Sequence, residues 1–266
     1  MSAADAPEVA SGLRVQTGSD GVQTWWLCNE ARRNAVSPEA LRWIAERSAT
    51  LRAEIVVLRG AGDRVFCAGF DLSALSEALD RDPRALPDQS LIAATLAMHQ
   101  ADATFIAAIE GHAIGAGVEL ACACDLRLCR RDVFFAVPAA ELGVVYHADG
   151  LTHIREVFGP AGVRRLLLLG DRIDAEDAWS AGALVRLCEP DQFETTLADM
   201  RTRLQAAAPL SLRGNRTLLR ALDRGPLTAD ERARHDARRR DAYASEDLQE
   251  AGRARRERRS PQFKGR

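Results

Sequence analysis

Two turns rich in Gly and Ala are the segments of this sequence best suited to chemistry. One lies in VFCAGFDL at 65–72 and the other in AIEGHAIGAGVEL at 108–120, and each follows a run of apolar residues that predicts a strand. Small residues let backbone N–H groups approach a ligand closely, and the N–H groups that open a helix have no partner within it. Two such groups aimed at one point would form an oxyanion hole, which stabilises negative charge developing on a carbonyl oxygen.

The second turn leads into a segment with a single charged residue. Between Val118 and Cys124 that residue is Glu119, so the predicted helix is apolar on almost every side. A buried carboxylate beside an oxyanion site is costly unless it is paired or protonated, which favours a functional acid/base role over a structural one. Nucleotide binding is not indicated, because GHAIGAG lacks both the GxGxxG pattern with a following acidic residue and the GK[ST] of a phosphate loop.

The elements that must position these turns alternate between strands and helices. The apolar runs at 13–17, 22–28, 54–60, 104–111, 126–130 and 134–138 predict strands. A helix is predicted from Pro38, with Ser37 as its N-cap and Glu39 in its first turn. This order predicts the α/β class, with largely buried strands.

The pattern changes after residue 150, where helical spacing dominates. Segments 160–169, 173–182, 192–207 and 209–223 are predicted helices, and the charged stretch 228–257 extends them. We therefore predict an α/β core over residues 1–200 and a helical C-terminal region over 201–266.

Composition limits the classes of ligand and the cellular location that we expect. A formal net charge of -2 gives no overall attraction to nucleic acid or to an anionic membrane, so neither partner is expected, and a polyanionic ligand would need a local cluster of Arg and Lys. The 6 cysteines lie in apolar segments without metal-ligand spacing, so we expect buried free thiols and no metal site. Without a signal peptide or an apolar run long enough to span a membrane, a cytoplasmic location is expected.

Taken together, the two turns and their surroundings resemble the crotonase, or enoyl-CoA hydratase/isomerase, superfamily. The matching pieces are FCAGFDL, GAGVEL followed by CDLRL, NEARRNAVS at 29–37, ELGVVY at 141–146, RIDAEDAWSAGALVRLCEP at 172–190 and the terminal SPQFKGR. The resemblance implies stacked ββα turns and a helical C-terminal region that builds trimers or paired trimers. It also implies a coenzyme A thioester as substrate, with no further cofactor.

The resemblance also assigns roles to positions of this chain. The oxyanion donors would be the backbone N–H groups of Ala68 and Ala116. The residues implied to bind coenzyme A or the acyl group are Arg32, Arg33, Ala35, Phe70, Asp71 and Leu72, with Phe263 and Lys264 at the adenine end.

The acid/base positions depart from the family pattern. Hydratases of the family use two carboxylates; the first matches Glu119, but the second falls on Ala139, and Glu141 lies two positions beyond it. Tyr146 falls where methylmalonyl-CoA decarboxylase has a Tyr, and His147 falls where dienoyl-CoA isomerases have a catalytic Asp. We therefore predict Glu119, Tyr146 and His147 as catalytic residues.

Three functions stay open on the sequence. An acyl-CoA lyase or isomerase that holds a thioester enolate is preferred, although the single carboxylate makes standard hydration doubtful. Decarboxylation of a malonyl-type thioester is the second, and Phe70 argues against a strict match to the decarboxylase, which has a His there. A non-catalytic acyl-CoA-binding member of the family is the third.

Overall fold

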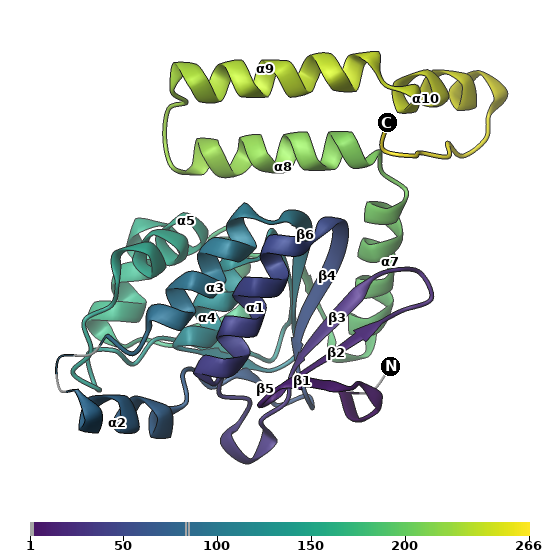
Figure 1. Ribbon diagram of the computed structural model, residues 1–266. Helices are drawn as coiled ribbons and strands as arrows, with labels where there is room; N and C mark the ends of the chain where they lie inside the picture. The colour runs from purple at the N-terminus through teal and green to yellow at the C-terminus, as the bar shows by residue number, and fades with distance from the viewer. Residues whose placement is uncertain (1–2, 83, 85) are drawn as a thin grey trace. The chain divides into compact units, whose positions relative to one another are not determined.

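The computed structural model describes residues 3–82, 84 and 86–266 (Figure 1). The chain divides into two compact units, residues 1–197 and 198–266, which are taken separately below. The first unit contains two sheets and the helices that cover them, and it holds both glycine-rich turns.

The larger sheet has 7 strands in the order β1-β2-β3-β4-β6-β8-β11. Their bounds are β1 Glu8–Ala10, β2 Leu13–Thr17, β3 Gln23–Leu27, β4 Arg52–Gly60, β6 Asp102–Ile109, β8 Leu126–Arg130 and β11 Arg186–Cys188. The strands from β3 to β11 are parallel, whereas β1, β2 and β3 pair antiparallel. The predicted strands therefore form a largely parallel sheet, as expected for an α/β core.

The smaller sheet positions the chemistry. It has 4 strands in the order β10-β9-β7-β5, namely β10 Ile173–Asp174, β9 Phe134–Ala136, β7 His112–Ile114 and β5 Val65–Cys67. Strands β5 and β7 are adjacent and parallel, with Cys67 paired to Ala113. Because parallel strands end at the same edge, the turns that follow β5 and β7 lie side by side.

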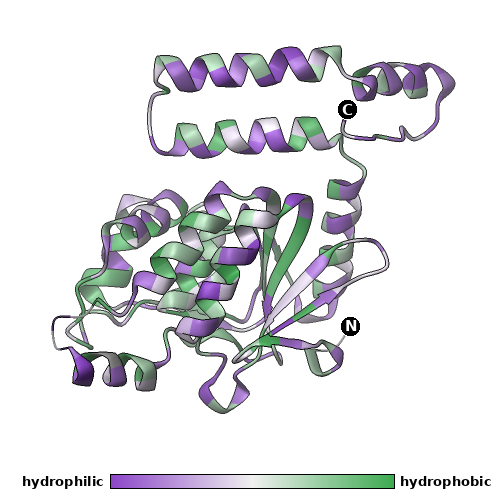
Figure 2. Cartoon of the chain, viewed as in Figure 1, coloured by the Kyte–Doolittle hydropathy of each residue, from purple (hydrophilic) through white to green (hydrophobic). Residues whose placement is uncertain are grey.

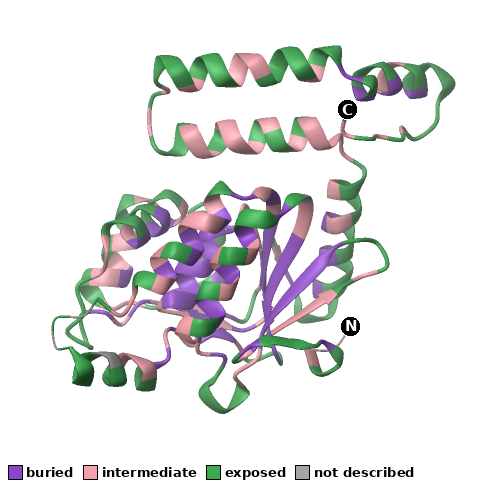
Figure 3. Cartoon of the chain, in the orientation of Figure 1, coloured by how far each residue is buried: buried purple, intermediate pink, exposed green. Residues whose placement is uncertain are grey.

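The first unit also contains the helices. They are α1 Pro38–Thr50, α2 Leu72–Arg81, α3 Gln89–Gln100, α4 Ala116–Ala123, α5 Ala148–Arg164 and α6 Ala175–Ser180, with α7 Phe193–Gln205 running across the unit boundary. The predicted N-cap of α1 is confirmed, since the Ser37 hydroxyl accepts the Ala40 N–H at 3.1 Å. Every residue of α4 is buried, and Figure 3 shows this helix at the centre of the core.

The remaining elements of the first unit are short turns, and some of them fall within predicted helices. They are the 3₁₀ turns η1 Ala3–Asp5, η2 Glu30–Arg32 and η4 Pro190–Gln192, and the π-turn η3 Arg165–Leu169 that continues α5. The predicted helix 160–169 is confirmed, because the non-helical backbone of Gly159, with φ 70° and ψ 172°, interrupts α5 and the turns that follow continue through η3. The predicted helix 173–182 begins with the two-residue strand β10.

The second unit is helical, as predicted. It contains α8 Pro209–Asp223, α9 Ala229–Ala244 and α10 Glu246–Glu257. Thr228 and Glu231 form a capping box at the start of α9, and Ser245 separates α9 from α10 by capping the latter. Figure 2 shows how hydrophilic α9 and α10 are.

Two further expectations of the sequence concern the cysteines and membrane-spanning helices. All 6 cysteines are free thiols, and five of them are buried as expected, whereas Cys28 is half-buried. No helix in the described part of the chain is both long and apolar enough to cross a membrane.

Candidate active site

The two glycine-rich turns touch one another at the ends of β5 and β7. A Cβ built on Gly69 would lie 3.4 Å from the Ile114 carbonyl oxygen and 3.8 Å from the Ala116 nitrogen. Gly69 has φ 108° and Gly115 has φ 53°, a region that favours glycine. The glycines therefore allow both the close approach and the turn conformation that the sequence indicated.

The first turn presents the N–H of Phe70, and this corrects the prediction for Ala68. The Ala68 N–H already donates to the Arg33 carbonyl at 3.0 Å, so it is not free to bind an oxyanion. Val36 and Phe70 form a parallel bridge in which the Val36 N–H donates to Gly69 and the Asp71 N–H donates to Val36, both at 2.9 Å. In such a bridge the N–H of the central residue points away from the neighbouring strand. The Phe70 N–H has no hydrogen-bond partner among the described residues.

The second turn presents the N–H of Ala116. Gly115 precedes α4 and donates its own N–H to the Ala136 carbonyl at 2.8 Å, which fixes the start of the helix. Ala116 is the first residue of α4, so its N–H has no partner within the helix. The structure thus places two backbone donors, from Phe70 and Ala116, on turns that are in contact.

Glu119 lies one helical turn beyond Ala116 and is 0% exposed. Its Oε1 lies 3.2 Å from His147 Nε2 and 3.4 Å from the Thr95 hydroxyl. Its Oε2 has no hydrogen-bond partner among the described residues. A buried acceptor without a partner is energetically unfavourable, which is typical of an atom that meets a substrate or a water.

His147 is held in one tautomer by its place in the fold. It is the N-cap of α5, and its Nδ1 accepts the Gly150 N–H at 3.0 Å. The neutral ring must therefore carry its proton on Nε2, the nitrogen that faces Glu119. Burial acts to lower the pKa of His147, but the hydrogen bond and negative charge of Glu119 outweigh it and raise the pKa above the ordinary 6.5.

Tyr146 completes the group around the carboxylate. Its ring stacks on that of His147, with centroids 5.5 Å apart and planes 12° from parallel. Burial, and then the charge and proximity of Glu119, raise the pKa of the Tyr146 hydroxyl well above 10.0. The hydroxyl therefore stays protonated at neutral pH, and it has no well-formed hydrogen bond among the described residues. It is available as a proton donor to a ligand.

Gly150 is required where α5 meets the carboxylate. A Cβ at this position would lie 2.6 Å from Glu119 Oε2 and 2.9 Å from the Cε1 of His147. We expect Gly150→Ala to lower the free energy of unfolding by about 1–3 kcal/mol, because neither buried group can move away without repacking. Chemical denaturation measures this; Gly214→Ala is the matched control, since a Cβ there meets nothing within 4 Å and should leave stability unchanged or slightly raised.

The titration of His147 is a second test of this arrangement. In Glu119→Gln the carboxylate is lost while burial remains, so the pKa of His147 should fall from above 6.5 to below it. A raised pKa contributes stability that is complete at low pH and is lost as the pH rises through the folded-state pKa. NMR titration of the imidazole measures the shift, and an unchanged pKa would show that Glu119 and His147 do not interact.

No second carboxylate joins the site from the segment after β9. Ala139 is buried at the position where hydratases of the family have their second carboxylate. Glu141 is exposed, and its Oε1 lies 3.3 Å from the place that a Cβ would take on Gly170. A sequence displacement of two residues has turned this side chain away.

The predicted coenzyme A residues are distributed over several places. Arg32 forms an ion pair with Asp71, which also accepts the Ser73 N–H at the start of α2. Burial acts to raise the pKa of Asp71, but Arg32 and the N–H donors hold it below the ordinary 3.8. Ala35 is half-buried and Leu72 is exposed beside this pair. Arg32, Asp71 and Leu72 thus lie around the turn that presents the Phe70 N–H.

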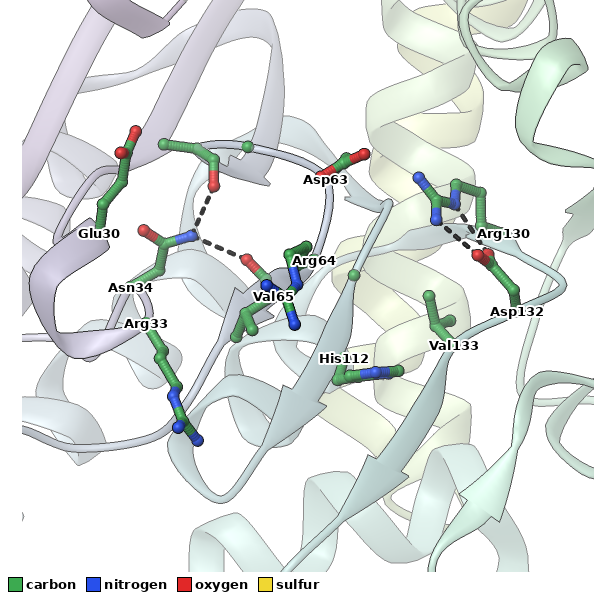
Figure 4. Close-up of a pocket in the computed structure, with 13 residues that line it drawn as sticks. Glu30, Arg33, Asn34, Asp63, Arg64, Val65, His112, Arg130, Asp132 and Val133 are labelled. Carbon is green, nitrogen blue, oxygen red and sulfur yellow. Dashed lines mark hydrogen bonds and ion pairs between the residues drawn. The ribbon is translucent and has the colours of Figure 1, made fainter.

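Arg33 does not join that group. It lines a pocket of about 660 Å³ with Arg64, His112 and Asp132, at the ends of β5 and β7 opposite to the two turns (Figure 4). In the same view the Asn34 amide donates to the carbonyls of Ala61 and Val65 and fixes the loop.

Phe263 and Lys264 lie in the second unit. The backbone N–H groups of Lys264 and Gly265 both donate to the buried Asp247 carboxylate, which fastens the C-terminal tail to α10. Phe263 lines a cavity of about 390 Å³ with residues of α8 and α9.

Two other side chains on β5 and β7 are structural. His112 accepts the Phe134 N–H through Nδ1 at 3.2 Å and stacks on the Phe134 ring. Burial raises the pKa of Cys67 to about 12, so this thiol is not a nucleophile at neutral pH.

Sequence reasoning missed Thr95, because α3 has no clear apolar stripe and was not predicted as a helix.

Comparison with known proteins identifies the family of the chain. The enoyl-CoA hydratase/isomerase family model matches residues 19–266. A carnitinyl-CoA dehydratase of Citrobacter koseri is 31% identical over 215 residues, covering 80% of this chain and 82% of the relative. The corresponding Proteus mirabilis protein is 30% identical over 224 residues, covering 80% of this chain and 82% of its own.

Solved structures give the same result. An enoyl-CoA hydratase/carnitine racemase from Magnetospirillum magneticum superposes with a TM-score of 0.85 at 29% identity, covering 96% of each chain. A structure described as a putative enoyl-CoA hydratase, from Streptomyces coelicolor, gives 0.85 at 29% identity, covering 98% of this chain and 97% of the other. The chain belongs to the enoyl-CoA hydratase/isomerase family, and its fold is that of the crotonase superfamily.

Proposed function

We propose that the protein is an acyl-CoA lyase or isomerase that stabilises a thioester enolate. The thioester oxygen would accept the N–H groups of Phe70 and Ala116, each worth about 3–4 kcal/mol in the transition state. Glu119 would move the proton, and its unpartnered Oε2 one turn beyond Ala116 is the observation that carries the proposal. Coenzyme A thioester is the substrate, and no further cofactor is proposed.

Tyr146 and His147 would supply what the missing second carboxylate does in hydratases. When Glu119 removes a proton next to the thioester carbonyl, the neutral His147 donates Nε2–H to the carboxylate and holds it in place. The Tyr146 hydroxyl can then donate a proton to the departing or rearranging group. Several relatives are called carnitinyl-CoA dehydratase, which favours elimination of a hydroxyl group within the lyase class.

A substrate panel tests the proposal. Crotonyl-CoA, a 3-hydroxyacyl-CoA, a 3-enoyl-CoA and methylmalonyl-CoA would each be incubated with the wild type, Glu119→Gln and Tyr146→Phe, with products followed by mass spectrometry. Loss or gain of water, or a moved double bond, abolished by Glu119→Gln supports the proposal. Turnover unchanged by Glu119→Gln would overturn it.

Decarboxylation is the second candidate, and the protonated Tyr146 hydroxyl beside Glu119 favours it. Loss of carbon dioxide from a malonyl-type thioester leaves an enolate that needs only a proton donor, not a base. Release of carbon dioxide that is lost in Tyr146→Phe and retained in Glu119→Gln would select it. Binding of acyl-CoA without any turnover would instead favour the non-catalytic member of the family.

Assembly and location are part of the same proposal. We propose a homotrimer or a dimer of trimers, with Phe263 and Lys264 reaching the adenine of coenzyme A. Helices α8 and α9 contain no buried residue, which supports a role in packing against another copy. A cytoplasmic location is proposed, and the free thiols are consistent with a reducing compartment.

A further inference from the structure

The pocket at the starting ends of β5 and β7 is separate from the two turns at their other ends. Its volume is about 660 Å³, within the range of about 300–1,000 Å³ that is usual for small-molecule sites. It is lined by residues around η2, by the loop between β4 and β5 and by the segment between β8 and β9 (Figure 4). The proposed chemistry of Glu119 uses none of this space.

Two arginines in the pocket have no partner for their charge. The side chains of Arg33 and Arg64 form no hydrogen bond or ion pair among the described residues, and Figure 4 shows Arg64 extending between Arg33 and His112. Arg130, by contrast, donates to both carboxylate oxygens of Asp132 at 2.8 and 2.6 Å, so that pair is already neutral. Two guanidinium groups are therefore available to a ligand, and such groups bind phosphate oxygens in pairs.

Uncharged donors lie beside the two arginines. The Nδ1 of His112 accepts the Phe134 N–H, so the neutral ring carries its proton on Nε2. Burial holds the pKa of His112 below the ordinary 6.5, which keeps the ring neutral at pH 7. In the loop before β5, the consecutive N–H groups of Gly62, Asp63 and Arg64 make no backbone hydrogen bond in the described part of the chain. Consecutive free N–H groups in a turn form a common cradle for anions.

The pocket also contains acceptors, which a bare anion would not use. Glu30 and Asp63 are exposed and form no ion pair in the part of the chain that the structure describes. Asn34 is 2% exposed, and its Oδ1 has no hydrogen-bond partner among the described residues. Figure 4 shows this oxygen on the side of Glu30, away from the two carbonyls that the amide nitrogen meets. A ligand with hydroxyl groups next to its anionic group would satisfy these atoms.

We propose that this pocket is a second ligand site, which binds a phosphate monoester with neighbouring hydroxyl groups, as in a sugar phosphate or a nucleoside monophosphate. Arg33, Arg64 and His112 hold the phosphate. Glu30 and Asn34 accept hydrogen bonds from the hydroxyl groups. Binding here is independent of the proposed function, because no thioester takes part in it.

The two arginines also connect the pocket to the turn that presents the Phe70 N–H. The carbonyl of Arg33 accepts the Ala68 N–H at 3.0 Å, and Arg64 directly precedes β5. A ligand that holds both side chains therefore restrains the two segments that carry this turn. We expect amide hydrogen exchange over residues 61–70 to slow when the pocket is filled.

Isothermal titration calorimetry with four probes tests the site: inorganic phosphate, ribose, ribose 5-phosphate and AMP. We expect ribose 5-phosphate to bind at least tenfold more tightly than inorganic phosphate, and ribose not to bind. Tighter binding of AMP than of ribose 5-phosphate would identify nucleotides as the source of the ligand, and equal or weaker binding would identify sugar phosphates. The absence of binding by both esters would overturn the inference.

Three substitutions locate the binding. Arg64→Gln should weaken the binding of ribose 5-phosphate at least tenfold, whereas the control Arg42→Gln, at an exposed position on α1 outside the pocket, should not change it. Glu30→Ala should weaken ribose 5-phosphate but leave inorganic phosphate bound equally or more tightly, because it removes a hydroxyl acceptor and a negative charge. An ester that binds Arg64→Gln as tightly as the wild type occupies another site and contradicts the inference.

Coenzyme A separates this pocket from the thioester site. Binding of ribose 5-phosphate should persist when coenzyme A is present at a saturating concentration. If coenzyme A displaced it, the pocket would be part of the thioester site and the inference would fail. If the wild type turns over no thioester, the binding data still decide on the pocket, and only the proposed function fails.

Discussion

Replacing Glu119 by Gln is expected to lower kcat/KM by about 10²–10⁴-fold, the usual effect of losing a positioned acid/base group. The amide keeps the shape of the side chain and its contact with His147, but it cannot accept a proton. Steady-state kinetics with the substrate that the panel identifies measures the loss. Unaltered binding of a substrate analogue would show that the effect is on chemistry.

Glu141→Gln is the matched control for this experiment. It removes the same charge from the carboxylate two residues beyond Ala139, which is exposed and lies near Gly170. Its activity should remain within twofold of the wild type. If Glu141→Gln abolished turnover instead, the second carboxylate would have to reach the site after all.

The second large effect is expected from Ala116→Pro, which should lower kcat by about 10²–10³-fold. Proline removes the N–H of residue 116 and is tolerated at the first position of a helix, and that N–H has no hydrogen-bond partner among the described residues. Ala116→Gly is the control, because it keeps the N–H and should retain most of the activity. Kinetics and thermal unfolding measured together separate the two outcomes.

A stably folded Ala116→Pro variant with wild-type turnover would contradict the oxyanion hole. A variant that unfolds would instead shift the test to the first turn. There Phe70→Leu should preserve activity, since it leaves the backbone donor in place and alters only the side chain. A collapse of activity in Phe70→Leu would assign the role of Phe70 to its ring.

The sequence predicted which segments form the candidate site more accurately than it predicted which backbone N–H groups face it. The Gly/Ala turns, the buried Glu119 and the alternation of strands with helices are local patterns, and the structure confirms them. Which N–H faces the site depends on the bridge between Val36 and Phe70, a contact between distant segments, so Ala68 was assigned where Phe70 presents the donor. Composition and spacing carry no information on that bridge.

The surroundings of Glu119 were predictable only in part. Tyr146 and His147 were singled out from the resemblance, yet the cap that fixes the tautomer of His147 requires α5 to begin at Ala148, before the predicted start of that helix. Thr95 lies on α3, a helix whose apolar residues show no clear periodicity. Its proximity to Glu119 depends on the packing of α3 against α4, which the sequence does not indicate.

The unpartnered oxygen of Glu119 also has a consequence for thermal stability. The core holds a carboxylate atom that the folded chain does not satisfy, and a neutral amide at this position would lose less on burial than a charged group. A protein selected only for durability would not retain this residue. Directed evolution for heat resistance should therefore tend to replace Glu119 and yield more robust proteins that no longer turn over substrate, a conflict between endurance and activity located at a single atom.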